Sequence, residues 1–123
     1  ITVLDASFSS GDNWLAQIVF HEIGHNWDSE NARWNQWRSI SGWRNVFWPG
    51  QSRSGYTQSS DATSWYRNGS TFARNYGRTN AYEDFATYFA KVMMDDNGLN
   101  YAGNGGTDAQ KEAFMDQFFA SLA

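Results

Sequence analysis

Along the first third of the chain, apolar positions recur every three or four residues, which is the period of an α-helix. This repeat predicts a helix over residues 13–28, and one line of it includes two histidines. Because the histidines continue a line that begins with apolar residues, we expect them on the buried face of the helix. The line consists of Trp14, Ile18, His21, His25 and Asp28.

Residues 1–4, ahead of this helix, are rich in β-branched side chains and predict a short strand. Residues 9–12 predict a turn, and Asp12 can cap the helix that follows. One short strand is little sheet, so the sheet is either reduced or continued by strands in a longer protein.

A second helix is predicted over residues 30–40, where tryptophans recur at helical spacing. Clustered tryptophan can form a sugar-binding platform, but in a small domain it more often fills the core. Residues 50–70 are rich in Ser, Gly, Thr and Asn and predict a long loop. The tryptophans of this region are Trp34, Trp37, Trp43, Trp48 and Trp65.

Two further helices are predicted from their start and stop signals. Asn80 with Glu83 three residues later matches a capping box, so a helix starts near Asn80, and Gly98 is a natural stop for it. Thr107 with Gln110 forms a second capping box, which predicts a last helix. The core-facing residues of this last helix are predicted to be Phe114, Phe118 and Leu122.

Length and composition limit the class of protein. The chain has 123 residues, which suits one domain with one core, and seven Trp, nine Phe and six Tyr can fill that core. No apolar run approaches membrane-spanning length, and a net charge of −4 without a basic cluster argues against nucleic acid as a partner. The absence of cysteine excludes disulfides and thiol chemistry.

We therefore expect a mostly helical α+β fold with a small or reduced sheet, in a single domain spanning residues 1–123, and a monomer. The chain begins at Ile1 with no methionine and no signal peptide, so we expect a processed or trimmed part of a longer protein. The scarcity of lysine beside many asparagines favours a secreted or extracellular protein.

The sequence His21-Glu22-Ile23-Gly24-His25 carries the candidate chemistry. Histidines four residues apart lie about one helical turn apart, so both imidazoles can reach one metal ion. Glu22 then lies beside the open position of the metal, where it can take a proton from a bound water, as in zinc proteases. The alternative interpretation of so short a motif is a pair of core histidines held by hydrogen bonds.

A catalytic zinc needs three protein ligands and a water, and the motif supplies only two. The chain has no other histidine, so the third ligand must be a carboxylate. Glu83 opens an amphipathic helix well suited to packing across the first one. The alternative, purely structural interpretation of Glu83 is the capping box with Asn80. The candidates are Glu83, Asp84, Asp95, Asp96, Asp108, Glu112 and Asp116.

Four segments of the chain belong together: His21-Glu22-Ile23-Gly24-His25 with Asp28, Tyr76-Gly77-Arg78-Thr79-Asn80, Glu83-x-Phe85-Ala86 with Phe89, and residues 110–119. Together they resemble the lethal-factor-like family of gluzincins, which are zinc proteases with a glutamate as third ligand. The resemblance covers roughly residues 19–123, is thin between residues 29 and 73, and is most specific in its second half.

The resemblance implies a zincin-like metalloprotease domain in which His21, His25 and Glu83 bind Zn²⁺. It also implies that Glu22 is the general base and that the Tyr76 hydroxyl stabilises the oxyanion as it forms. Without the resemblance, Tyr76 is better interpreted as a buried aromatic residue beside a helix start.

One position departs from the family pattern. The family has a second carboxylate one turn after the glutamate ligand, where it orients a zinc-bound histidine, and this chain has Thr87 there. A hydroxyl can accept that hydrogen bond but brings no charge, so metal affinity or activity is expected to be lower. Asp28, on the same line as the histidines, is the candidate to serve instead.

The function implied is a zinc-dependent endopeptidase that acts on a peptide or protein substrate. Two alternatives stay open: a zinc-binding toxin or interaction domain with little or no catalysis, and a tryptophan-rich carbohydrate-binding module. The intact Glu22 favours the protease, whereas Thr87 and the scant sheet favour the first alternative. Residues 95–106, rich in Asp, Asn and Gly, carry a weak signal for a second cation that does not match an EF-hand.

Overall fold

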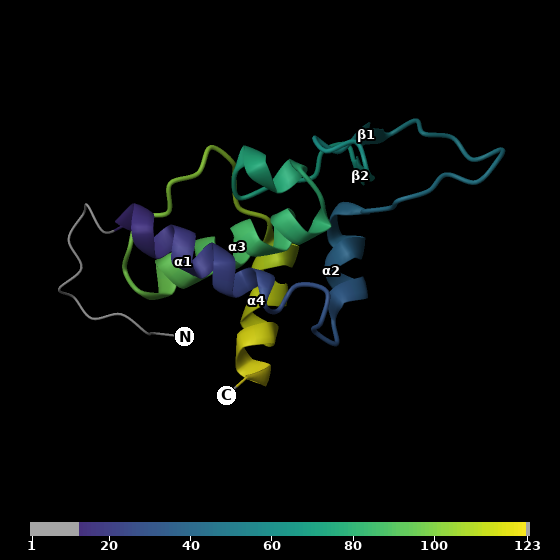
Figure 1. Ribbon diagram of the computed structural model, residues 1–123. Helices are drawn as coiled ribbons and strands as arrows, with labels where there is room; N and C mark the ends of the chain where they lie inside the picture. The colour runs from purple at the N-terminus through teal and green to yellow at the C-terminus, as the bar shows by residue number, and fades with distance from the viewer. Residues whose placement is uncertain (1–12, 123) are drawn as a thin grey trace.

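The structure, a computed structural model, describes residues 13–122 and shows a mixed but mostly helical chain (Figure 1). The expected α+β class with a small sheet is confirmed at this level. The predicted strand at residues 1–4, the turn at 9–12 and the Asp12 cap lie outside the described residues. The elements are α1 (Asn13–His25), α2 (Trp34–Ser41), β1 (Tyr56–Gln58), β2 (Trp65–Arg67), the 3-10 turn η2 (Asn75–Arg78), α3 (Ala81–Asp96) and α4 (Ala109–Ser121).

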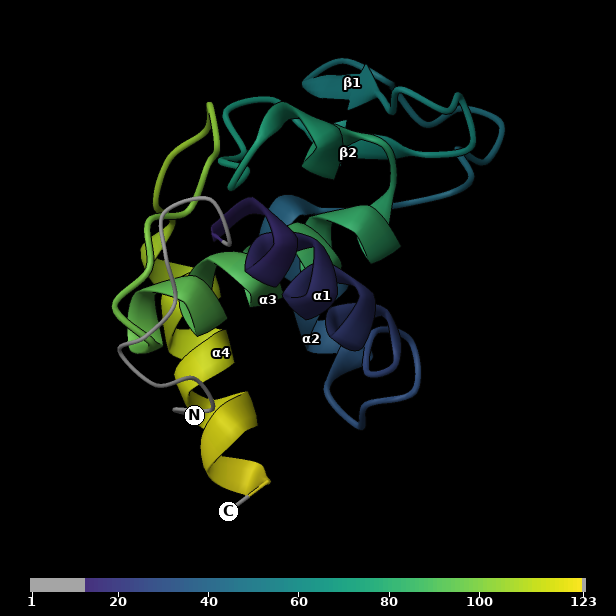
Figure 2. The same cartoon turned by 60° about the vertical axis from the view of Figure 1, so that its left-hand side comes forward.

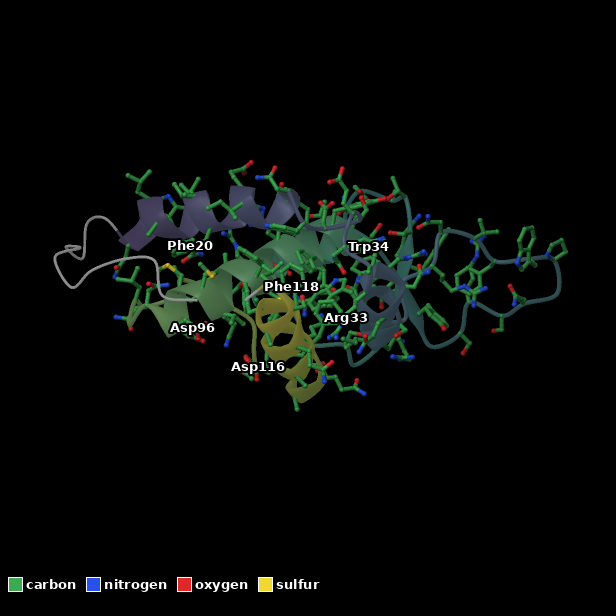
Figure 3. All side chains as sticks on the ribbon, turned by 90° about the horizontal axis from the view of Figure 1, so that it is seen from below. Phe20, Arg33, Trp34, Asp96, Asp116 and Phe118 are labelled. Atoms are coloured by element: carbon green, nitrogen blue, oxygen red, sulfur yellow. The ribbon has the colours of Figure 1, made fainter. Side chains whose placement is uncertain are left out.

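Helix α1 packs against α3 along its length (Figures 1 and 3). Its buried side includes Ala16, Phe20 and Gly24. A β-carbon at Gly24 would lie 3.1 Å from the Ala86 Cα and 3.2 Å from the Phe89 Cβ, which is tighter than ordinary packing. The glycine of the histidine motif therefore lets the backbones of α1 and α3 approach closely.

The predicted burial of the histidine line of α1 is wrong. Trp14 and Ile18 are 50% and 42% exposed, and they border an open pocket instead of the core. Apolar residues occupy several faces of α1, so its own sequence does not select the buried one. Contact with α3 selects the face that carries Ala16 and Phe20.

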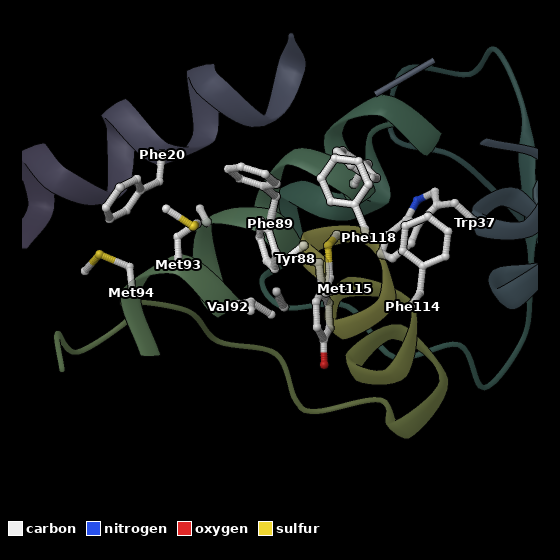
Figure 4. Close-up of a cluster of buried hydrophobic side chains, with 14 of the residues drawn as sticks. Phe20, Trp37, Tyr88, Phe89, Val92, Met93, Met94, Phe114, Met115 and Phe118 are labelled. Carbon is white, nitrogen blue, oxygen red and sulfur yellow. The ribbon is translucent and has the colours of Figure 1, made fainter. Parts of the chain in front are cut away.

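Helix α3 is the central element of the core, and residues 84–90 are all buried. Its aromatic rings meet those of α4 edge to face, as in the pair Phe89 and Phe118, whose centroids are 6.4 Å apart (Figure 4). Trp37 of α2 is fully buried against Phe114, with ring centroids 5.1 Å apart. No helix within residues 13–122 is both long and apolar enough to cross a membrane.

Helices α1 and α2 are shorter than predicted, because residues 26–33 form turns. The Asn31 Nδ2 lies 2.8 Å from the Trp27 carbonyl oxygen and 2.6 Å from that of Asp28. The Asn31 Oδ1 also accepts from the Arg33 N–H, at 2.8 Å. These side-chain bonds compete with helical ones, so α1 ends at His25 and α2 begins at residue 34.

The predicted tryptophan core is confirmed for Trp37 and Trp43, which are buried. Trp43 packs with Tyr66 and Phe72 in a second, smaller cluster. Trp48 is 66% exposed, so the prediction is wrong for that residue.

Residues 50–70, predicted as a loop, contain an antiparallel hairpin of β1 and β2 (Figure 2). Tyr56 and Trp65, one from each strand, both pack on Phe47, at 5.3 Å between ring centroids. These aromatic residues favour strands, but each strand has only three residues between polar turns. The Ser- and Gly-rich composition predicted a loop throughout, and this prediction is wrong for the two short strands.

The last helix, α4, is confirmed, but its cap is displaced by one residue. Asp108, not Thr107, is the N-cap, and its Oδ1 accepts from the backbone N–H groups of residues 110 and 111 at 2.8 and 3.1 Å. Phe114 and Phe118 are buried as predicted. Leu122 lies beyond the end of the helix and is 40% exposed, so its predicted core position is wrong.

Candidate metal centre

Three side chains converge where α1 passes the first turn of α3. The His21 Nε2 lies 3.0 Å and the His25 Nε2 2.6 Å from the same atom, the Glu83 Oε1. The potential ligand atoms lie within 4.8 Å of one another, and among residues 13–122 no other group of three His, Cys, Asp or Glu side chains can hold a metal. The imidazoles are 14% and 28% exposed, so both are only partly buried.

The start of α3 holds Glu83 in place. The Asn80 Oδ1 accepts from the Glu83 N–H at 2.9 Å, which confirms Asn80 as the N-cap, and the Asn80 Nδ2 donates to the Asp61 Oδ2 at 2.9 Å. The Glu83 carboxylate points to the histidines instead of closing the capping box. Burial raises the pKa of Glu83, but the hydrogen bond with His21 and the charges of both histidines lower it below its ordinary value, which favours the carboxylate form.

His25 has a second carboxylate on its other nitrogen. The His25 Nδ1 lies 3.1 Å from the Asp28 Oδ2, and an N–H donated there leaves Nε2 free to bind a metal. Burial lowers the pKa of His25, but the bond with Asp28 and the charge of Glu83 outweigh it and raise the pKa. The Thr87 Oγ1 instead lies 2.8 and 3.0 Å from the backbone oxygens of Glu83 and Asp84, within its own helix.

Tyr76 approaches the same centre from η2. Its ring centroid lies 5.9 Å from that of His21. The nearby charge of Glu83, above all, raises the pKa of Tyr76, which favours the protonated hydroxyl. The residue is 48% exposed, so its interpretation as a buried aromatic residue is wrong.

Glu22 and Tyr76 line one open pocket of about 200 Å³ beside His21. Glu22 is exposed on α1, adjacent in the chain to the potential ligand. The candidate base, the candidate oxyanion donor and one potential metal ligand therefore border the same space. The lining residues are Trp14, Gln17, Ile18, His21, Glu22, Arg74 and Tyr76.

The other carboxylates considered as third ligand lie outside the group. Asp84 is buried with Lys111, whose Nζ is 2.8 Å from the Asp84 Oδ1. Asp108 caps α4, and the Glu112 Oε1 accepts from the Tyr88 hydroxyl at 2.8 Å. In the described part of the chain, the acids of residues 95–106 form no group of three potential ligands. The remaining candidates are Asp95, Asp96 and Asp116, all exposed.

Two residues of the pocket wall were missed by the sequence analysis. The Gln17 side chain binds both backbone groups of Ala102, donating at 2.8 Å and accepting at 2.7 Å, and so fixes that loop to α1. The Arg74 guanidinium carbon lies 5.6 and 5.7 Å from the ring centroids of Trp14 and Tyr76. No local pattern reveals the contacts of Gln17 with Ala102 and of Arg74 with Trp14, because these partners are far apart in sequence.

No family model, no curated protein and no solved structure matches this chain. The resemblance to the lethal-factor-like family therefore stays a prediction from its motifs. The observations that remain are the mixed, mostly helical fold and the potential ligand group at the meeting of α1 and α3.

Proposed function

We propose that this chain is a zinc-dependent endopeptidase of the gluzincin type with a zincin-like fold. The observation that carries the proposal is the convergence of the His21 and His25 Nε2 atoms on one oxygen of Glu83. Two histidines and one glutamate are a ligand set of catalytic zinc sites, which keep a fourth position for water. Imidazole ligands also favour zinc over magnesium or calcium, which prefer oxygen.

The chemistry and spacing of the three side chains fit a zinc ion. Ligand atoms about 2 Å from a tetrahedral zinc lie about 3.3 Å apart, so separations of 3.0 and 2.6 Å need only small side-chain movements. The charged form of Glu83 and the Asp28 bond to His25 both suit a cation. Zinc bound there would lower the pKa of a water and polarise a peptide carbonyl.

The residues of the pocket then have separate roles. Glu22 takes the proton of the attacking water and passes it to the leaving amine. The Tyr76 hydroxyl donates a hydrogen bond to the carbonyl oxygen as negative charge develops, and its raised pKa keeps that proton available. Asp28 orients the imidazole of His25.

The motif resemblance to lethal-factor-like gluzincins supports the same proposal. The family's second carboxylate is replaced by Thr87, whose hydroxyl is engaged within α3. Asp28 supplies a carboxylate to His25 from the turn after α1 instead. We therefore propose that Asp28 compensates for Thr87 and that the site retains its affinity for zinc.

Zinc content and proteolysis, measured together, test the proposal. The purified chain is expected to hold about one zinc per molecule and to cut an unstructured protein substrate, and chelation should abolish the cutting until zinc is restored. His25→Ala is expected to lose the metal, whereas Asn26→Ala, an exposed neighbour, should keep it. Zinc content unchanged in His25→Ala would contradict the ligand assignment. Zinc without cutting by the wild type would favour the non-catalytic alternative.

Tyr76→Phe is expected to lower kcat about a hundredfold to a thousandfold with little change in KM. The substitution removes only the hydroxyl, whose hydrogen bond to the oxyanion belongs to the transition state. Tyr82→Phe is the matched control, because Tyr82 precedes Glu83 and is 47% exposed. Steady-state kinetics of both variants, with melting curves, decide the matter, and near-normal turnover in Tyr76→Phe would remove Tyr76 from the mechanism.

The carbohydrate-binding alternative has less structural support. Trp37 and Trp43 are buried and cannot form a platform. Trp14, Trp27 and Trp48 are exposed, but they lie in separate segments: in α1, in the turn after it and in the loop before β1. Glycan binding that survives removal of the metal would favour this alternative over the protease.

A further inference from the structure

The pocket beside the candidate metal centre meets a second hollow of about 480 Å³. Trp14, Arg74 and Tyr76 line both, whereas His21 and Glu22 line only the first. Arg74 therefore lies at the junction, where a substrate that extends away from the metal would pass it.

The side chain of Arg74 is held between two aromatic rings. Its guanidinium carbon lies 5.6 Å from the Trp14 ring centroid and 5.7 Å from that of Tyr76, which are cation–π distances. Within residues 13–122, no carboxylate forms an ion pair with it. Within the described residues, the two rings that lie nearest this cation carry no negative charge.

The backbone that carries Arg74 is fixed from one side by a glycine-rich segment. The Gly105 N–H donates to the Ala73 carbonyl at 3.2 Å and the Gly106 N–H to the Phe72 carbonyl at 2.9 Å. A β-carbon at Gly105 would lie 1.7 Å from the Phe72 carbonyl oxygen, so only glycine fits there. Arg74 follows this anchored pair directly, which reduces the cost of ordering it when a ligand binds.

We propose that Arg74 binds a carboxylate of the substrate, so that the pocket selects peptides with an acidic group near the bond that is cut. The inference rests on the proposed endopeptidase function. A guanidinium can donate two parallel N–H bonds to one carboxylate, and Trp14 and Ile18 offer apolar walls to the methylene groups of a glutamate. The carboxylate can come from an acidic side chain or from a C-terminus.

The test uses the zinc-loaded Glu22→Gln variant, which should bind peptides without cutting them. End-blocked peptides carry a single Glu, or Gln in its place, at successive positions of a neutral sequence, and calorimetry measures Kd. At one position the Glu peptide is expected to bind about tenfold tighter or more, since bonds between charged groups contribute that much. Adding Arg74→Gln should abolish the preference, and Arg74→Lys should retain part of it.

A third peptide ends at that position with Gln and a free C-terminal carboxylate. Its Kd shows whether Arg74 binds an acidic side chain or a C-terminus. Arg53→Gln is the matched control, because Arg53 also lies near two rings, those of Phe47 and of Trp65 in β2. That variant should keep the preference.

Several results would overturn the Arg74 assignment: equal Kd values for Glu and Gln peptides at every position, a preference that survives Arg74→Gln, or no binding of any peptide. Failure of the endopeptidase proposal gives a different result. The wild type would then cut no peptide, while the Arg74-dependent binding preference would remain.

Discussion

Lys111→Met is expected to destabilise the folded chain by about 3–5 kcal/mol, because it leaves a buried carboxylate without its counter-ion. Lys111 and Asp84 are both fully buried, with the Lys111 Nζ 2.8 Å from the Asp84 Oδ1. The ammonium also donates to the Thr71 carbonyl at 2.7 Å, and the Trp43 indole N–H donates to the Asp84 Oδ2 at 2.9 Å. The charged atoms of both side chains therefore have hydrogen-bond partners. Removal of the ammonium leaves the buried Asp84 carboxylate without its counter-ion and the Thr71 carbonyl without this donor.

Urea unfolding of matched variants measures this effect. Lys91→Met is the control, because the other lysine of the chain makes looser, partly exposed pairs, at 3.3 Å with Glu112 and 3.4 Å with Asp95. We expect Lys91→Met to cost below about 1 kcal/mol. Asp84→Asn removes the unpaired charge, so the double variant Lys111→Met/Asp84→Asn should be more stable than Lys111→Met alone. Equal midpoints for Lys91→Met and Lys111→Met would contradict the role of the pair.

The same buried pair supports the candidate metal centre. Asp84 follows Glu83 in α3, and Thr71 lies in the segment that leads to Arg74 and Tyr76. Lys111 of α4 thus ties together the two pieces of chain that carry these side chains. Lys111→Met should therefore weaken zinc binding as well as stability, although it touches no proposed ligand.

The potential ligand group could be predicted from the sequence, because its signals are local. The spacing of His21 and His25 defines one helix, and the Asn80 cap defines the start of another. Among the candidate acids, only Glu83 lies in the first turn of α3 and also directs its carboxylate toward the histidines of α1. The choice among the acids required the structure or the family resemblance.

The remaining features depend on contacts between distant segments. Contact with α3 decides which face of α1 is buried. Trp14 and Ile18 therefore line the pocket, although their helical spacing also fits a buried face. Nothing in the sequence indicated that Lys111 pairs with Asp84, because the two residues lie in different helices. The hairpin was concealed because strands of three residues give too short a period to detect.

Glu22→Gln is expected to reduce peptide hydrolysis by about 10²–10⁴-fold or to below detection, the contribution of a general base, while zinc stays bound. The amide has nearly the same shape as the carboxylate but cannot accept the proton of the attacking water. Glu22 is exposed and is not in the potential ligand group, so neither folding nor metal binding should change. Turnover, zinc content and melting temperature are measured on the same preparation.

Glu30→Gln provides the control for loss of a negative charge near the site, because Glu30 is exposed in the turn after α1. It should leave turnover unchanged. Zinc loss in Glu22→Gln would mean that the residue acts on the metal and not on the water. Full turnover with zinc retained would remove Glu22 as the base. Tyr76 is proposed to act on the carbonyl oxygen and Glu22 on the water. The double variant should therefore be no worse than Glu22→Gln alone only if the two residues act as a unit.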